Sequence, residues 1–138
     1  MKLLLHICCA PCAIGIVDRL QKNPDIDLSG YFYNPNIHPS EERHKRMLSV
    51  EAMSKEFDLP VDAAARLAVE NGLDAFTTSL LTSPYQNHEL IRTIGQRAAQ
   101  KYGVTFYDED FREFYRKGRE MARARGFYMQ KYCGCMYS

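Results

Sequence analysis

Two groups of cysteines stand near the two ends of this 138-residue sequence. Cys8, Cys9 and Cys12 follow a short apolar segment, whereas Cys133 and Cys135 flank a single glycine. Thiolates this close in sequence can bind one soft metal ion or cluster, or they can exchange electrons as thiol and disulfide. We therefore expect a metal centre at the first group. The second group can add metal ligands or form a strained, easily reduced disulfide.

The elements that must position these thiols alternate between strands and helices. The apolar segment 3–7 predicts a buried strand, and Pro11 favours a helix that starts soon after it and ends near Gln21. Further strands are predicted at residues 28–33, 75–81 and 104–107. Further helices are predicted at residues 40–58, 61–70, 88–102 and 113–125. This alternation is typical of the α/β class with a mainly parallel sheet and flanking helices.

In a parallel sheet the segments that follow the strands meet at one edge, where such proteins bind ligands. At that edge we expect the first cysteine group and the loops that contain His38, His88 and Asp110. The two histidines can be hydrogen-bonding loop residues or metal ligands, and Asp110 can be a turn residue or a ligand of iron. His6 lies inside the apolar segment and is expected to be a core histidine.

The composition is that of one soluble globular domain, with 46% hydrophobic and 25% charged residues. The apolar segment is too short to span a membrane and meets cysteines instead of a cleavage site, so we expect a cytoplasmic protein without membrane association. In that compartment, clustered cysteines indicate metal or redox chemistry. The net charge is only +1, but residues 112–131 contain seven basic and two acidic residues, which fits phosphate binding or a solvated helix face.

Five segments of the sequence together resemble the epoxyqueuosine reductases of the QueH family. They are Leu-His-Ile-Cys-Cys-Ala-Pro-Cys at 5–12, Tyr-Asn-Pro-Asn-Ile-His-Pro at 33–39, Leu-Leu-Thr-Ser-Pro-Tyr-Gln-Asn-His at 80–88, Glu-Asp-Phe-Arg at 109–112 and Gln-Lys-Tyr-Cys-Gly-Cys at 130–135. The resemblance implies a nucleotide alpha-hydrolase-like (Rossmann-like) fold and a single iron-sulfur reductase domain over residues 1–138. It also implies reduction of epoxyqueuosine to queuosine at the wobble position of tRNA anticodons.

The resemblance also implies the cofactors: a 4Fe-4S cluster and an additional mononuclear iron. Carried over residue by residue, it makes Cys8 and Cys9 cluster ligands and Cys133 and Cys135 a redox-active pair. Cys12 matches the third cysteine of the first motif and is assigned to metal. One family feature is missing, because a further Cys-x-x-Cys segment has no counterpart after Pro60. We expect that the sequence omits this ligand-bearing segment.

Conversion of an epoxide to an alkene consumes two electrons and two protons and removes the oxygen as water. Candidate proton donors are His38, His88 and Asp110. The expected partners are a tRNA with a queuosine-type anticodon, whose target base would stack on aromatic side chains, and an unidentified electron donor. Candidate RNA contacts are Tyr33, Asn34, Tyr85, Asn87 and Arg112.

Two alternative functions fit the cysteine groups. The first is a metal-free thiol-disulfide oxidoreductase that uses both groups. The second is a non-catalytic RNA- or nucleotide-binding module on the same fold, in which the thiols hold structural zinc.

Overall fold

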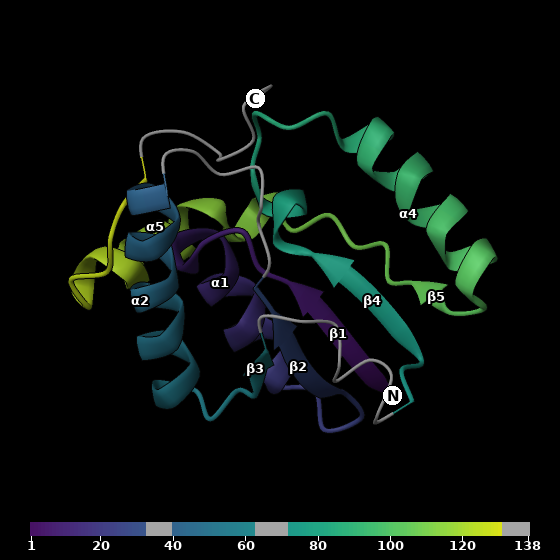
Figure 1. The fold of residues 1–138 in the computed structure, drawn as a ribbon, viewed down its shortest axis with the longest axis horizontal. Coiled ribbons are helices and arrows are strands. Elements are labelled where there is room, and N and C mark those ends of the chain that lie inside the picture. Colours follow the sequence, from purple (N-terminus) through teal and green to yellow (C-terminus); the bar gives the residue numbers. More distant parts are fainter. Residues whose placement is uncertain (33–39, 63–71, 131–138) are drawn as a thin grey trace.

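The structure is a computed structural model that describes residues 1–32, 40–62 and 72–130. Within these residues a five-stranded sheet has the order β3-β2-β1-β4-β5, and all neighbouring strands are parallel (Figure 1). The strands are β1 (Lys2–His6), β2 (Asp27–Tyr31), β3 (Val61–Asp62), β4 (Ala75–Thr78) and β5 (Thr105–Phe106). The predicted α/β class with a mainly parallel sheet is confirmed.

Helices connect the strands. They are α1 (Ala10–Gln21), α2 (Ser40–Glu56), α4 (His88–Tyr102) and α5 (Tyr115–Ala124), with the 3-10 turns η1 (Ser79–Thr82) and η2 (Arg112–Phe114). The predicted limits of the helix after Asn87 are confirmed. The Asn87 side chain accepts the Leu90 N–H at 3.1 Å, and Gly103 ends the helix with φ of 69°, a conformation that glycine adopts without strain.

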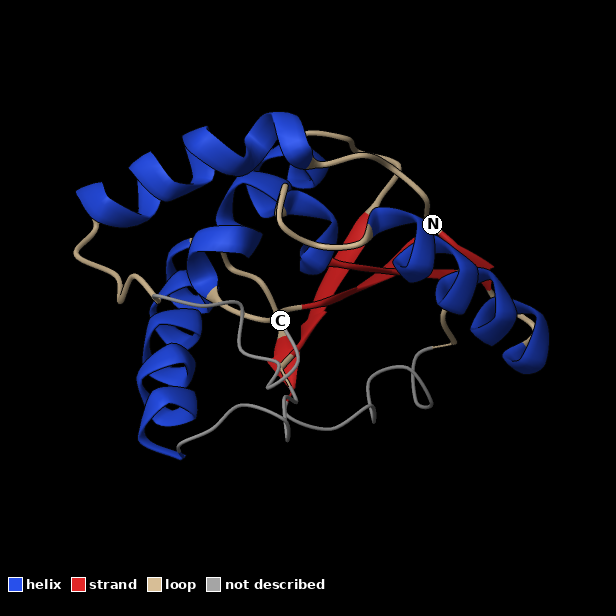
Figure 2. Cartoon of the chain, turned by 90° about the horizontal axis from the view of Figure 1, so that it is seen from above, coloured by secondary structure: helices blue, strands red, loops and turns tan. Residues whose placement is uncertain are grey.

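Helix α1 is buried along most of its length and lies between the sheet and α5 (Figure 2). The two helices approach closely because glycines stand at their contact. A Cβ on Gly118 would lie 2.8 Å from the carbonyl oxygen of Pro11, and a Cβ on Gly15 would lie 3.1 Å from Phe114. Helix α5 is therefore fixed against the first turn of α1, which contains Cys12.

The carboxyl ends of three strands are in register. His6, the last residue of β1, pairs with Tyr31 of β2 and with Thr78 of β4. From β1 the chain proceeds to β2 and β3 on one side, and β4 then returns to the other side of β1. This reversal is the topological switch point, where parallel α/β proteins bind ligands. Cys8 follows β1 and Ser79 follows β4, so both residues lie at that point.

The structure corrects two of the predicted elements. Residues 61–70 are predicted to be helical, but Val61 and Asp62 form the edge strand β3, because they pair with Gly30 and Tyr31 of β2. The strand predicted at 75–81 ends at Thr78 and continues as η1. This happens because the Thr78 hydroxyl accepts the Leu80 N–H and caps the turn. The remainder of the helix predicted at 61–70 falls outside the described residues.

The described part of the chain contains no helix long and apolar enough to cross a membrane.

Candidate metal centre

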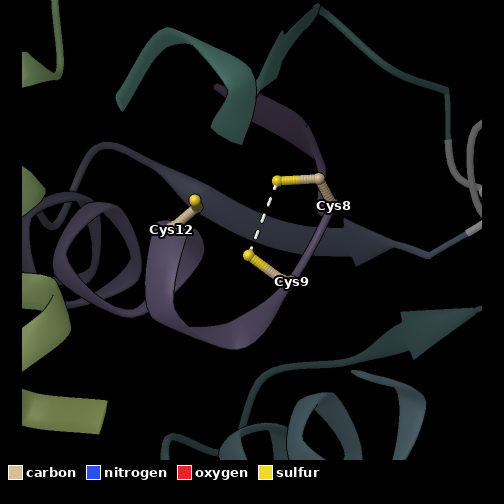
Figure 3. A group of neighbouring side chains, drawn as sticks. All are labelled: Cys8, Cys9 and Cys12. Atoms are coloured by element: carbon tan, nitrogen blue, oxygen red, sulfur yellow. Dashed lines mark hydrogen bonds between the residues drawn. The ribbon is translucent and has the colours of Figure 1, made fainter. Parts of the chain in front are cut away.

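Three thiols converge where β1 leads into α1. Cys8 and Cys9 lie on the connecting loop and Cys12 lies in the first turn of α1, with their sulfur atoms directed toward a common space (Figure 3). All three sulfurs lie within 4.8 Å of one another, and the residues are only 3%, 1% and 3% exposed. Among the described residues, this is the one group of three or more metal-ligating side chains so close together. The structure therefore unites the three cysteines assigned to metal.

Residues of η1 hold this cysteine loop from the β4 side. The Ser79 hydroxyl accepts the backbone N–H of Cys8 at 2.9 Å and donates to the Cys8 sulfur at 3.1 Å. The Thr82 hydroxyl donates to the carbonyl oxygen of Cys12 at 3.0 Å. The sequence assigns neither hydroxyl a role: Ser79 falls inside the strand predicted at 75–81, and Thr82 belongs to the segment 80–88 only as part of a motif. The turn η1 directs both hydroxyls toward the cysteine loop.

The three thiols differ in acidity. Hydrogen bonds from the Cys12 and Cys9 thiols, and further from Ser79, lower the pKa of Cys8 against the opposing effect of burial. Burial raises the pKa of Cys9, and hydrogen bonding to Cys8 raises the pKa of Cys12. The N-terminus of α1 also favours negative charge nearby. Cys8 is therefore the thiol of the group that loses its proton most readily, and the thiolate is the form that binds a metal cation.

The donor set fits a soft metal centre. Thiolates select zinc, copper(I) and iron-sulfur clusters, and three of them can supply three ligands of a four-iron cluster. The sulfurs of Cys8 and Cys9 are 3.8 Å apart. That separation matches the edge of a tetrahedron around one metal ion with bonds of about 2.3 Å, so a larger cluster requires the thiols to move apart.

His88, Asp110 and Arg112 lie on the segments that follow β4 and β5. His88 is buried, and its Nε2 lies 2.7 Å from the carbonyl oxygen of Ser83, so this nitrogen carries a proton. Its Nδ1 has no hydrogen-bond partner among the described residues. Hydrogen bonds from Arg112 hold the pKa of Asp110 well below its usual range, with distances of 2.6 to 3.1 Å. Asp110 is therefore a carboxylate at neutral pH.

A pair of aromatic rings connects the segment after η1 with α5. Tyr85 is 83% exposed and makes an edge contact with Tyr115 of α5, with 6.2 Å between ring centroids. The Arg119 guanidinium lies over the other ring of the pair, 5.5 Å from the Tyr115 centroid. Tyr85 is three residues beyond Thr82, which bonds to Cys12. Tyr115 and Arg119 are not singled out by the sequence; the basic character of residues 112–131 is the signal that includes them.

His6 is half-buried, and its Nδ1 lies 3.0 Å from the Thr78 hydroxyl. Asn87 uses its side-chain oxygen to cap α4. The remaining candidate residues lie outside the described part of the chain: Tyr33, Asn34, His38, Cys133 and Cys135.

Fold and site together define a parallel α/β protein with a buried three-thiol centre at its switch point. The sequence model of the family described as epoxyqueuosine reductase QueH matches residues 3–64 and 57–138. The chain therefore belongs to the QueH family of epoxyqueuosine reductases, which are oxidoreductases.

Individual relatives agree with this membership. The epoxyqueuosine reductase QueH of Acinetobacter baylyi is 34% identical, over 99% of this chain and 80% of that protein. The one from Histophilus somni is 33% identical, over 99% of this chain and 72% of that protein. Both alignments extend over 175 positions, although the chain has 138 residues, so at least 37 positions of the relatives have no counterpart here. The two stretches matched by the family overlap at residues 57–64, near the predicted omission after Pro60.

A solved structure has the same fold. The U34-tRNA thiolase NcsA from Methanococcus maripaludis, determined with its [4Fe-4S] cluster, matches with a TM-score of 0.57 at 12% identity. The match covers 100% of this chain and 61% of the thiolase chain. It confirms the nucleotide alpha-hydrolase-like (Rossmann-like) architecture.

Proposed function

We propose that this chain reduces epoxyqueuosine to queuosine at the wobble position of tRNA anticodons, at a metal centre held by Cys8, Cys9 and Cys12. Family membership supports the reaction. The main observation that supports this site is the convergence of three buried thiols at the switch point of the sheet. When bound there, a 4Fe-4S cluster supplies electrons one at a time.

Three thiols can bind three of the four irons of such a cluster. The fourth iron needs another protein donor or keeps an open coordination position. The segment that the relatives carry and this chain lacks is a source of such donors. The family match is interrupted around residues 57–64, which include β3. The overlap of the two matched stretches includes positions on both sides of β3. Because β3 is parallel to β2, a segment that followed Asp62, instead of directly following Pro60, would start at the same sheet edge as the thiols. The additional mononuclear iron stays a prediction, with His88 and Asp110 as candidate ligands.

The redox-active pair is Cys133 and Cys135. Oxidation of a dithiol to a disulfide releases two electrons and two protons, which is the number that removal of the epoxide oxygen as water requires. Gln130, whose side chain contacts Cys9, precedes Cys133 by three residues. Three residues of chain span at most about 10 to 11 Å, so this spacing supports a dithiol that can reach the three thiols. A separate electron donor then returns the disulfide to the dithiol.

Among the described candidates for the proton donor, His88 is the better one. Its Nε2 proton is engaged by the Ser83 carbonyl oxygen and its Nδ1 has no described partner, so Nδ1 is the ring atom left to exchange a proton with a substrate. Asp110 is ion-paired with Arg112 and has no proton to give at neutral pH. His38 is the third candidate.

The substrate RNA binds by stacking and by charge. The exposed Tyr85 ring, backed by Tyr115, offers a face for an unpaired base, and basic residues on α5 attract phosphates. The other candidate RNA contacts are Tyr33, Asn34, Asn87 and Arg112.

One observation favours a second candidate, an RNA-binding module with structural zinc. The 3.8 Å separation of the Cys8 and Cys9 sulfurs fits a single tetrahedral ion. A zinc site of this kind needs a fourth donor, and no fourth metal-ligating side chain joins the group among residues 1–32, 40–62 and 72–130.

The test is an anaerobic incubation of the chain with tRNA that carries epoxyqueuosine and a chemical reductant. Mass spectrometry of the digested RNA should show a nucleoside lighter by one oxygen atom. Cys8→Ala and Cys9→Ala should abolish both the conversion and the metal. Cys133→Ser should keep the metal and lose the conversion. Full conversion by Cys8→Ala would contradict the proposal.

A further inference from the structure

The side chain of Gln130 reaches the three-thiol group from the far end of the chain. Its Nε2 lies 2.8 Å from the sulfur of Cys9 and 3.7 Å from the sulfur of Cys12. A metal-bound thiolate has only lone pairs to offer, so the amide must present an N–H to it. Hydrogen bonds to ligand sulfurs hold ligands in place and tune metal centres.

The backbone that carries Gln130 is anchored on α2. The N–H of Tyr128 donates to the Ser49 hydroxyl at 2.9 Å, and the Tyr128 hydroxyl donates to the carboxylate of Glu42. Glu42 also accepts a hydrogen bond from the fully buried Arg46 at 2.7 Å. These contacts fix the segment two residues before Gln130, so the amide is held in place rather than lying against the thiols by chance.

The other half of the Gln130 amide is unused in the described structure. Its Oε1 is buried and has no hydrogen-bond partner among the described residues. A buried acceptor without a donor destabilises the folded protein, so such a group in a protein calls for a specific explanation, such as a role at a functional site. An amide placed here for packing alone would be better replaced by an apolar side chain.

We propose that Gln130 is a positioning residue of the metal centre, whose side-chain N–H donates to the sulfur of Cys9 and orients this ligand toward the metal. The inference rests on the proposed function only in taking the three thiols as metal ligands. The inference adds Gln130 to the residues of the metal centre. Gln130 stands three residues before Cys133, so the segment that precedes the dithiol then takes part in the centre.

The experiment is a titration of the purified, reduced chain with Co²⁺ alone, followed through the absorption of the thiolate-to-cobalt bands. Gln130→Leu keeps the size of the side chain and removes the N–H donor. Gln130→Asn keeps an amide but is one methylene group too short for the same contact. Gln96→Leu is the matched control, because Gln96 is an exposed glutamine of α4. Thermal unfolding of each metal-free chain reports whether it is folded.

We expect Gln130→Leu and Gln130→Asn to bind Co²⁺ about tenfold or more weakly, as loss of a partner of a ligand does in other metal sites. Gln96→Leu should bind like the unchanged chain. If either folded Gln130 variant binds Co²⁺ within about twofold of the unchanged chain, the proposal is wrong. Cobalt binding requires neither a cluster nor RNA, so this outcome is distinct from a failure of the chain to reduce epoxyqueuosine.

Discussion

The hydroxyl of Ser79 makes two contacts with Cys8: it accepts the backbone N–H at 2.9 Å and donates to the sulfur at 3.1 Å. The two residues are 71 positions apart in sequence, at the ends of the neighbouring strands β1 and β4. One short side chain thus fixes both the backbone and the sulfur of a metal-ligand candidate across the switch point.

Ser79→Ala should therefore loosen the centre. We expect metal to be lost to a chelator about tenfold faster or more, since Cys8 loses both contacts. Thr77→Val is the matched control two residues earlier, on β4. The buried Thr77 hydroxyl has no described partner, so its removal should leave metal retention unchanged. Equal loss rates for Ser79→Ala and the unchanged chain would show that the contacts do not support the centre.

The acid sensitivity of the fold should depend on Glu42. Burial raises the pKa of Glu42, but hydrogen bonds from Tyr128 and Arg46 outweigh burial and leave the pKa below its usual value. A carboxyl whose pKa is lowered on folding stabilises the protein above the unfolded value of about 4.3 and loses this contribution as pH falls through the folded pKa. The free energy of unfolding of the unchanged chain, measured with urea, should thus decrease as the pH falls from about 5 to about 3.

Glu42→Gln should show a weaker dependence on pH over that range. At neutral pH the variant should be about 3 kcal/mol less stable, because the buried Arg46 loses its carboxylate partner. If the free energy of unfolding of Glu42→Gln depends on pH as in the unchanged chain, other carboxyl groups cause the acid sensitivity and the prediction is wrong.

Tyr85→Ala should weaken the binding of an anticodon stem-loop RNA. Stacking of one base on an aromatic ring contributes about 1 to 3 kcal/mol, so we expect roughly a tenfold loss of affinity in a fluorescence anisotropy titration. Tyr102→Ala is the control. Like Tyr85, Tyr102 is largely exposed, at 70%, and it has Lys101 over its ring, but it lies at the C-terminal end of α4, whereas Tyr85 precedes the N-terminal end. Similar losses for both variants would indicate nonspecific surface contact instead of a stacking site.

Gly118→Ala should disturb the centre through the backbone. The added Cβ would lie 2.8 Å from the carbonyl oxygen of Pro11, so α5 or the first turn of α1 must shift. We expect a net destabilisation of about 1 kcal/mol, because an overpacking cost of about 1 to 3 kcal/mol exceeds the gain from alanine in a helix. Metal affinity should fall as well.

Gly95→Ala separates the two effects of that substitution. Its Cβ would meet the ring of Phe106 at 2.7 Å, far along the chain from the cysteines, so it should reduce stability without reducing metal affinity. The urea midpoint and the Co²⁺ titration measure the two properties. Unchanged metal affinity in Gly118→Ala would mean that the contact between α5 and α1 does not control the centre.

Local signals in the sequence predicted much of the fold. The apolar run of β1, the proline of α1 and the Asn87 and Gly103 ends of α4 each act within a few residues. The edge strand β3 could not be predicted in this way, because its two residues are strands only through their pairing with β2. The end of β4 was missed because a capping hydroxyl at Thr78, and not the apolar pattern, decides it.

In the candidate site, too, local sequence signals predicted some features, whereas contacts between distant residues could not be predicted. The close spacing of the cysteines predicted that Cys8, Cys9 and Cys12 would lie together, and the structure confirms it. The contacts of Ser79 and Gln130 with these thiols join positions more than 70 residues apart. Such contacts follow from strand order and from the docking of residues 127–130 on α2, which no local pattern encodes.

The most direct test of the metal centre is to purify the chain without oxygen and to quantify iron, acid-labile sulfide and zinc per polypeptide. The proposed function predicts about four sulfides and four or more irons per chain, with both lost in Cys8→Ala. Zinc at about one ion per chain without sulfide would contradict it and would instead support a structural zinc site.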